Sequence, residues 1–384
     1  MANEEKEIEP VLTGTAFADA VQRVVVCATR KGPFEQTSLI HLKAVGNKLG
    51  FRACDLNQEA SVGIPYDGQS FETSVNGELL ARLAPAFIND ELFSIEIPPK
   101  DGEIILRGES SMIRVPATKE VKPPEFPRPT PDHTFSIQGN RLSEAIAGVS
   151  YALDGEENIA LPALNGICMR SKDRMTLTAS SQRSSIERVI ETEGESKPID
   201  VILPLFAANY LVGNFSETPI LLCFGKNQMT AKCGTLEYRS VLIDAKYPDT
   251  VSLFAKIAEQ TNEAILVNRK EMLRAIMALI PLYPRIDKLF NPMMRLEVTT
   301  AHCRLSTDIG EGSYVSLHGY REAETPVTLY ISGTKMQDMF KHLKSNMVVI
   351  RFGRDEKLPM LMEPPEGEHD AGKVRAFLSA KARV

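Results

Sequence analysis

The chain has 384 residues, 43% of them hydrophobic, which is too long for one compact core and long enough for two or three domains. Its six cysteines form no Cys-x-x-Cys pair and no His/Cys cluster, which argues against a zinc site or a disulfide framework. The N-terminus is acidic and polar, and no stretch approaches about 18 consecutive apolar residues, so we expect a soluble, cytoplasmic protein with no membrane contact. The formal net charge of -6 argues against a protein that holds nucleic acid by overall charge, so such a role must rest on local charge or on topology.

The first third of the chain predicts the order helix, strands, helix, strands. An amphipathic stretch at residues 17–29 predicts a helix, and two strands joined by a turn at Gly46 and Asn47 follow it. After two more strand-like runs, a second helical stretch at residues 77–87 leads to strands that end near Val115.

The same order returns twice along the chain. The later helices are expected at residues 140–152 and 205–213 in the second set, and at residues 269–280 and 335–343 in the third. Equivalent strands align on Phe51, Leu177 and Leu305, which lie about 126 to 128 residues apart. A period of this length indicates repeated domains, each with its own core, and excludes a short-repeat solenoid.

Two stretches mark the junctions between the repeats. Residues 116–131 are charged and rich in proline, as in a semi-rigid extended linker, and the second junction lies at about residues 247–262. We therefore expect three α+β domains, at residues 1–129, 130–255 and 256–384, each with two helices packed on antiparallel sheets. Antiparallel sheets leave unpaired edges, and closing the domains into a ring would pair them.

Three local motifs resemble those of a known family. They are Leu164-Asn165-Gly166, Tyr247-Pro248-Asp249 and the segment VNRKEMLRAIMAL at residues 267–279. With the repeat length and the linker positions, they make the chain similar to a divergent member of the bacterial DNA polymerase III beta subunit family, the DNA sliding clamps. The resemblance implies three clamp domains in a head-to-tail homodimer ring that encircles duplex DNA and gives a DNA polymerase its processivity. It implies no catalytic activity, metal or cofactor.

The resemblance places basic helix residues on the inner face of the ring, where they would contact phosphates without reading sequence. The candidates are Arg23, Arg30, Lys31, Arg82, Arg141, Arg269, Lys270, Arg274, Lys335, Lys341 and Lys344. Each of them fits an ordinary solvated helix face equally well. The second domain fits poorly because its helix at residues 205–213 has no basic residue, so we expect a low DNA affinity that is very sensitive to salt.

The resemblance also implies a hydrophobic pocket between the second and third domains, which takes short peptides of the DNA polymerase and the clamp loader. The candidates by position are Leu164, Ser180, Gln182, Arg183, Pro248, Ser252, Leu253, Phe377 and Leu378. Several residues depart from the family pattern. Ser252 replaces an expected arginine, Gln182 lies in ASSQRS where the family has TDGHRL, and the terminus is FLSAKARV. These departures predict a different or restricted set of partners, and core packing is the alternative role for the three leucines.

The dimer contact is expected between Met112 and Ile113 of one copy and Leu279 and Ile280 of the other, although all four residues also fit a domain core. Two other functions were weighed against a replication clamp. An enzyme is disfavoured because the six histidines are scattered, with no HExxH, Gly-x-Ser-x-Gly or Walker motif. A clamp-like paralogue that acts as an interaction scaffold outside core replication would share the fold, so the sequence leaves it open.

Overall fold

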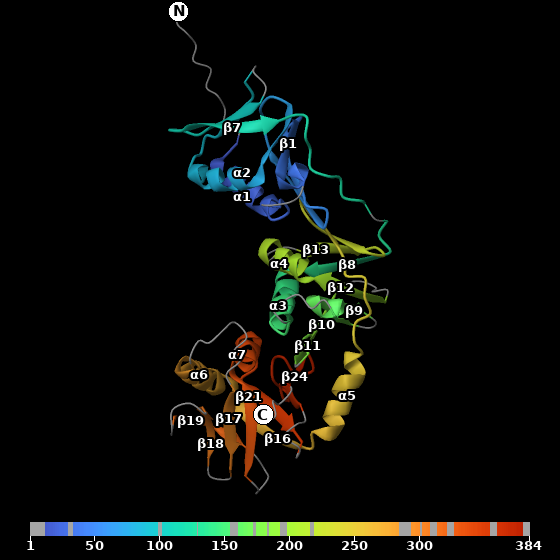
Figure 1. The fold of residues 1–384 in the computed structure, drawn as a ribbon, viewed down its shortest axis with the longest axis vertical. Helices are drawn as coiled ribbons and strands as arrows, with labels where there is room; N and C mark the ends of the chain where they lie inside the picture. Colours follow the sequence, from blue (N-terminus) through green and yellow to red (C-terminus); the bar gives the residue numbers. More distant parts are fainter. Residues whose placement is uncertain are drawn as a thin grey trace, which may run out of the picture. The chain divides into compact units, whose positions relative to one another are not determined.

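The computed structural model describes residues 12–29, 34–98, 102–128, 130–153, 160–171, 174–182, 184–192, 198–215, 219–283, 293–299, 302–307, 313–320, 326–353 and 359–378. The chain divides into two compact units (Figure 1). The first unit comprises residues 1–139 and 213–242, and the second comprises residues 140–212 and 243–384. No helix in the described ranges has the length and the apolar character needed to cross a membrane.

Strands of the first unit form an antiparallel sheet in the order β5-β6-β7-β4-β1-β2-β3-β15-β14-β13-β8. They are β1 (Leu39–Val45), β2 (Lys48–Cys54), β3 (Gln58–Pro65), β4 (Phe71–Asn76), β5 (Ser94–Glu96), β6 (Glu103–Arg107), β7 (Met112–Thr118), β8 (His133–Gln138), β13 (Pro219–Phe224), β14 (Gln228–Cys233) and β15 (Leu236–Val241). The helices of this unit are α1 (Gly14–Val25), α2 (Gly77–Leu83) and the short 3-10 helices η1 (Glu35–Ser38) and η2 (Ala84–Phe87).

Helix α1 packs against η2 through an unusually close backbone contact. Its N-cap residue Thr13 accepts a hydrogen bond from the Ala16 N–H at 3.2 Å. A Cβ atom at Gly14 would lie 1.6 Å from the carbonyl oxygen of Phe87, so only glycine lets α1 begin at this point. Further along α1, the fully buried ring of Phe17 lies 4.6 Å from that of Phe93 and holds the helix over the sheet.

The pairing of β3 with β15 joins strands that are far apart in the sequence. Glu59 of β3 is buried, and its carboxylate forms ion pairs with Arg239 of β15 and with Arg52 of β2. Arg52 also donates hydrogen bonds to the carbonyl oxygens of Pro123 and Pro124, at 3.0 and 2.8 Å. The proline-rich linker is therefore tied to the sheet by the same charged cluster that lies at the β3–β15 junction.

The second unit contains a nine-stranded sheet, β12-β9-β10-β11-β24-β23-β22-β16-β20, and a four-stranded sheet, β19-β18-β17-β21, among its described residues. Its strands are β9 (Gly166–Ser171), β10 (Met175–Ser180), β11 (Ser184–Ile190), β12 (Ile199–Pro204), β16 (Glu263–Asn268), β17 (Met293–Val298), β18 (Cys303–Thr307), β19 (Tyr314–Leu317), β20 (Gly319–Tyr320), β21 (Val327–Ser332), β22 (Met347–Phe352), β23 (Met360–Glu363) and β24 (Val374–Leu378).

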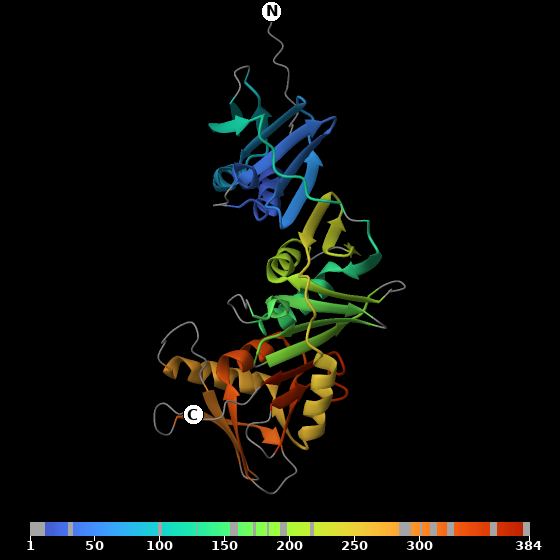
Figure 2. The same ribbon diagram turned by 45° about the vertical axis from the view of Figure 1, so that its right-hand side comes forward.

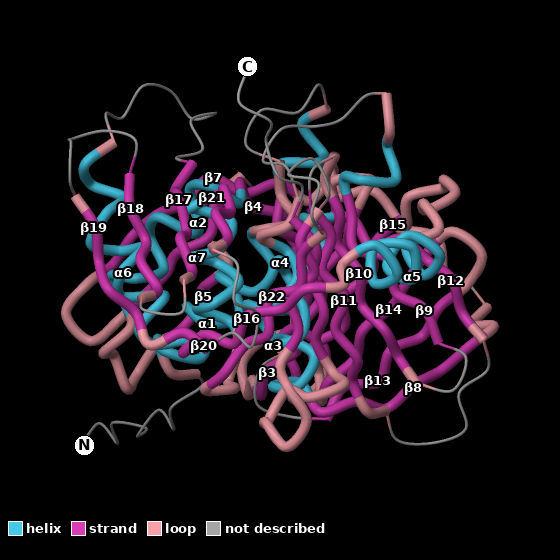
Figure 3. The backbone as a smooth tube through the Cα atoms, turned by 90° about the horizontal axis from the view of Figure 1, so that it is seen from below, coloured by secondary structure: helices cyan, strands magenta, loops and turns pink. Residues whose placement is uncertain are grey.

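The helices of the second unit are α3 (Gly139–Ser150), α4 (Leu205–Asn214), α5 (Thr250–Gln260), α6 (Arg269–Leu279) and α7 (Gly333–His342), with the 3-10 helices η3 (Pro162–Asn165) and η4 (Ile280–Leu282). Gly139 and the last two residues of α4 fall in the first unit. Helix α5, the yellow helix near the C-terminal part of the chain in Figure 2, packs on β23, and α6 lies beside β18 and β19 (Figure 3).

The six predicted helices are confirmed, with ends that shift by a few residues. The first runs over Gly14–Val25 in place of residues 17–29. Helix α5 was missed, because residues 247–262 were interpreted as a junction. Each compact unit takes residues from more than one of the three expected domains, so the domain boundaries stay a prediction.

Candidate functional site

The first unit exposes two of the predicted DNA-facing arginines. Arg23 lies in the last turn of α1, and Arg82 lies in the last turn of α2, where a positive charge is favourable for the helix dipole. The two helices contact each other, so both arginines belong to one helical layer. Arg30 and Lys31 lie outside the described residues.

Two basic residues of helix α6 are exposed to solvent, and a third forms hydrogen bonds within the protein. Lys270 and Arg274 are exposed, as a phosphate contact requires. The Arg269 guanidinium instead donates hydrogen bonds to the carbonyl oxygens of Ser345 and Phe340, at 2.7 and 3.0 Å, and so ties α6 to the end of α7. The structure therefore gives Arg269 a structural role, and its expected DNA contact stays a prediction.

Lys335 of α7 also has an intramolecular role. Its Nζ donates to the carbonyl oxygens of Tyr151 and Ala152, at 3.2 and 3.3 Å, where α3 ends and its carbonyls lack helical partners. The ring of His342 stacks on that of Tyr151 with centroids 5.3 Å apart. These contacts fix α7 against α3, and they occupy a lysine that the sequence assigns to DNA.

The remaining predicted cations near α3 are exposed, and each has a carboxylate neighbour. Lys341 lies 3.9 Å from Asp338, Lys344 lies 2.6 Å from Glu144, and Arg141 lies 3.8 Å from Glu191. Exposed pairs of this kind contribute little and exchange easily with another anion. Helix α4 has no basic residue, which agrees with the expected poor charge of the second domain.

Four residues of the predicted partner pocket lie in the sheet or under it. Ser180 ends β10 and pairs across the sheet with Ser185 of β11, which in turn pairs with Phe377 of β24. The hydroxyls of Ser180 and Ser185 are 2.7 Å apart. Phe377 and Leu378 in β24 and Leu164 in η3 are 5 to 8% exposed. Strands β10, β11 and β24 therefore bring together residues that are nearly 200 positions apart in the sequence.

Tyr247 connects η3 to the start of α5. Its hydroxyl donates to the carbonyl oxygen of Thr178 at 3.2 Å, and its ring packs with Ala163 and Cys168. Burial raises the pKa of Tyr247, so its hydroxyl stays a donor at neutral pH. The buried tyrosine thus fixes the position of the exposed Pro248, which follows it.

Helix α5 presents apolar side chains to solvent on one side and to the core on the other. Its N-cap Asp249 accepts from the Ser252 N–H at 3.1 Å, so Ser252 is fixed in the first turn. Leu253 is 39% exposed and Val251 is 56% exposed. Phe254 faces inward, with its ring 5.4 Å from that of Phe377. The exposed part of the predicted pocket therefore lies along α5.

The predicted pocket residues thus form two groups. The exposed group comprises Gln182, Pro248, Ser252 and Leu253, and the buried group comprises Leu164, Ser180, Phe377 and Leu378. Core packing, the alternative role for the leucines, is the observed one for Leu164 and Leu378. Arg183 lies outside the described residues. Val251 was missed, and the Asp249 cap followed by apolar residues at helical spacing was the signal that could have found it.

The apolar residues of the predicted dimer contact differ in exposure. Met112 is 51% exposed at the start of β7, and Ile113 follows it half-buried. Leu279 is 4% exposed inside the core, so the alternative role as a core residue is the observed one, whereas Ile280 is half-buried. The dimer contact therefore stays a prediction.

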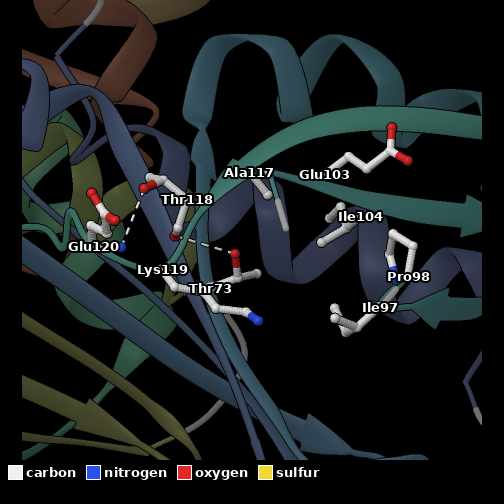
Figure 4. A pocket seen from close by; sticks show the side chains of 10 residues that line it. Thr73, Ile97, Pro98, Glu103, Ile104, Ala117, Thr118, Lys119 and Glu120 are labelled. Carbon is white, nitrogen blue, oxygen red and sulfur yellow. Dashed lines mark hydrogen bonds between the residues drawn. The ribbon is translucent and has the colours of Figure 1, made fainter. Parts of the chain in front are cut away.

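A cavity of about 260 Å³ lies where β7 leaves β6 and joins β4. Figure 4 shows apolar side chains, Ile97, Pro98 and Ile104, on one side of it. On the other side, the Thr73 hydroxyl donates to the carbonyl oxygen of Thr118 at 3.2 Å. Neither histidine nor cysteine is among the residues that line this cavity.

The Cys/His neighbours at the start of β18 do not form a reactive pair. Cys303 is buried, and burial, with a contribution from Glu271, raises the pKa of its thiol to about 11. His302 instead contacts the hydroxyl of Thr299 through Nδ1 at 3.2 Å. In the described part of the chain, no group of three or more His, Cys, Asp and Glu side chains is arranged to hold a metal ion.

Asp370 is a buried carboxylate that holds the loop after α7. It accepts hydrogen bonds from the N–H groups of Lys344 and Ser345, at 2.6 and 3.0 Å, and lies 3.7 Å from Arg188. Burial by itself would raise the pKa of Asp370, but these contacts and the His369 ring outweigh burial and hold the pKa below its ordinary value.

The Asp370→Asn variant is expected to unfold more easily at neutral pH, by about 1.5 to 3 kcal/mol, because these charge-assisted hydrogen bonds are lost. A carboxylate with a depressed pKa stabilises the fold above its unfolded pKa of about 3.9, and this stabilisation is lost as the pH falls through the folded pKa. Urea unfolding at pH 7 and pH 3 measures this. The gap between the two proteins should narrow at pH 3, and an equal gap at both pH values contradicts the assignment.

Comparison with known proteins finds DNA sliding clamps with a similar fold. No family model matches the chain. The beta sliding clamp of Staphylococcus epidermidis is 28% identical over 134 residues, which span 34% of this chain and only 35% of that protein. The structure of the beta subunit of DNA polymerase of Streptococcus pyogenes matches with a TM-score of 0.84 at 16% identity, over 97% of this chain and 99% of the other.

A second similar structure, the Helicobacter pylori beta clamp bound to a DNA ligase peptide, matches with a TM-score of 0.81 at 15% identity, over 97% and 99% of the two chains. The resemblance predicted from the three motifs is therefore confirmed. The chain has the sliding-clamp fold, with helices on antiparallel sheets along nearly its whole length.

Proposed function

We propose that this protein is a DNA sliding clamp, a non-catalytic processivity factor of DNA replication. It encircles duplex DNA as a head-to-tail homodimer ring and tethers a DNA polymerase and a clamp loader in the cytoplasm. The observation that carries this proposal is the likeness of fold to a polymerase beta subunit over 97% of the chain. The three clamp domains are assigned to residues 1–129, 130–255 and 256–384, because the order of helices and strands repeats with that period.

The charge distribution suits a ring that slides. Retention by encirclement needs no strong contact, so a few exposed cations such as Arg23, Arg82, Lys270 and Arg274 suffice to hold the DNA in the channel. Contacts to phosphates carry no sequence information, which lets the ring move along the duplex. A net charge of -6 is compatible with this function because the inner helices carry the cations.

The exposed side of α5 is the proposed docking surface for partner peptides. Val251, Leu253 and Pro248 are exposed there and supply apolar contacts. The Helicobacter pylori clamp bound to a ligase peptide supports a peptide-binding role for this fold. Ser252 lacks the charge of an arginine, so we propose that this surface accepts a restricted set of peptides that do not need a cation at this point.

A scaffold outside core replication is the second candidate. It is favoured by the absence of basic residues from α4 and by the use of Arg269 and Lys335 in intramolecular hydrogen bonds. Such a protein would keep the partner surface and bind DNA weakly or not at all.

Retention on circular DNA tests the two candidates directly. The protein is loaded onto nicked circular duplex with a matched clamp loader and ATP, and is then washed with high salt, which strips electrostatic binders. A sliding clamp stays on the circle and leaves after the circle is cut once. If the protein is retained on neither form, while a known clamp is retained with the same loader, the scaffold is favoured.

A further inference from the structure

A groove of about 360 Å³ in the second unit is lined by cations from four segments. Arg141 comes from α3 and Arg174 from the turn before β10. Lys344 follows α7, and Lys373 precedes β24. Figure 1 labels the elements that bring these segments together, α3, β10, α7 and β24. The first two of the four cations belong to the second domain, which the sequence marks as poor in charge.

The floor of this groove is rigid. Arg188 of β11 is 9% exposed and donates to the carbonyl oxygen of Glu144 at 3.5 Å. A Cβ at Gly148 would lie 2.4 Å from the Arg188 guanidinium, so glycine lets α3 lie directly on it. The buried Asp370 neutralises Arg188 from the other side. The positions of the surrounding cations are therefore set by a packed frame.

The rim of the groove carries unbalanced positive charge. Arg141 and Lys344 have the exposed carboxylates of Glu191 and Glu144 as neighbours. Arg174 and Lys373 are exposed and have no acidic partner among the described residues. A concave site with surplus positive charge attracts a multivalent anion, and phosphate groups of a polymer fit this chemistry best.

We propose that Arg174 and Lys373, with Arg141 and Lys344, bind phosphates of the duplex that passes along the helices. The inference rests on the proposed sliding clamp and extends it, because it supplies the second domain with DNA contacts that α4 lacks. The two residues escape sequence reasoning because they lie in turns next to strands, whereas the DNA-facing candidates were sought on helices.

The test compares the double variant R174Q/K373Q with a charge-matched control, K226Q/K256Q. Lys226 and Lys256 are also exposed, also lack an acidic partner in the described ranges, and lie outside the groove. Binding of the full chain to a short linear duplex is measured by fluorescence anisotropy between 50 and 200 mM salt. The slope of log K against log salt should become shallower by about 1.8 in the double variant, at 0.9 for each lost phosphate contact. The control should keep the slope of the unaltered chain.

Three outcomes overturn this inference and are distinguishable. The first is retention of the unaltered chain on circles with equal salt slopes in the double variant and the control. It rejects the DNA contacts of the groove and leaves the sliding-clamp proposal standing. The second is absence of duplex binding by the unaltered chain together with its loss from circles. It rejects both the DNA contacts of the groove and the sliding-clamp proposal. Calorimetric binding of tripolyphosphate that only the double variant loses, with no change in duplex affinity, assigns the groove to a small polyphosphate.

Discussion

Replacing Glu59 with glutamine should cost the fold about 3 to 5 kcal/mol, because two arginines would be left without their shared carboxylate in a buried site. The Glu59 side chain is 5% exposed and that of Arg239 is 10% exposed, and among the described residues Arg239 would keep only its ion pair with Glu237. Arg52 would keep its hydrogen bonds to the linker carbonyls but would lose its charge balance. The loss should therefore weaken the pairing of β3 with β15 more than the rest of the sheet.

Urea unfolding followed by circular dichroism measures this effect, and hydrogen exchange of the β15 amides localises it. The matched control is Glu363→Gln, which breaks a pair with Arg351 whose side chains are 43 and 34% exposed. An exposed pair of this kind is worth at most about 1 kcal/mol. Equal shifts in the two variants would mean that the buried cluster contributes no more than a surface pair.

Phe377→Ala is expected to destabilise the second unit by about 3 to 5 kcal/mol, although the sequence assigned this residue to a partner pocket. Its ring packs with Phe254, Ile257 and Leu361, and it is 7% exposed. The guanidinium of Arg375 covers the ring of Phe254, at 4.6 Å from its centroid. Truncation would leave a cavity under α5 that this small cluster cannot refill.

Leu253→Ala separates partner binding from stability, because this side chain is 39% exposed on the same helix. Its unfolding midpoint should stay close to that of the unaltered chain, while its affinity for a polymerase-derived peptide should fall severalfold. Both variants are compared by urea unfolding and by peptide titration. If the Phe377→Ala protein is as stable as the unaltered chain but binds the peptide more weakly, Phe377 contacts the peptide as the sequence predicted.

The sequence predicted those features that depend on local pattern. Apolar residues at helical spacing located six helices, and the long repeat indicated the domain architecture. Helix α5 was missed because the Tyr247-Pro248-Asp249 turn was interpreted as the start of a junction, although Asp249 is the helix cap. A turn signal and a cap signal use the same residue types, so periodicity in the following residues has to decide between them.

The site was predicted less well because its side chains find partners that are distant in the sequence. Lys335 binds carbonyl oxygens 183 and 184 positions earlier, and Arg269 binds those 71 and 76 positions later. A basic residue on an amphipathic helix gives the same sequence pattern whether it faces a phosphate or the end of a neighbouring helix. Only the tertiary arrangement distinguishes the two.

The β3–β15 pairing also has a consequence for the chain while it is being made. Tyr238 and Gln58, which are hydrogen-bonded across this junction, are separated by 180 residues. At about 5 to 20 residues per second, the ribosome leaves the β3 edge without its neighbour for roughly 10 to 40 s. An inward-pointing charge on an open edge strand discourages pairing with another nascent chain, and Glu59 is such a charge. We therefore expect the carboxylate that joins the finished strands also to discourage aggregation of the unfinished chain.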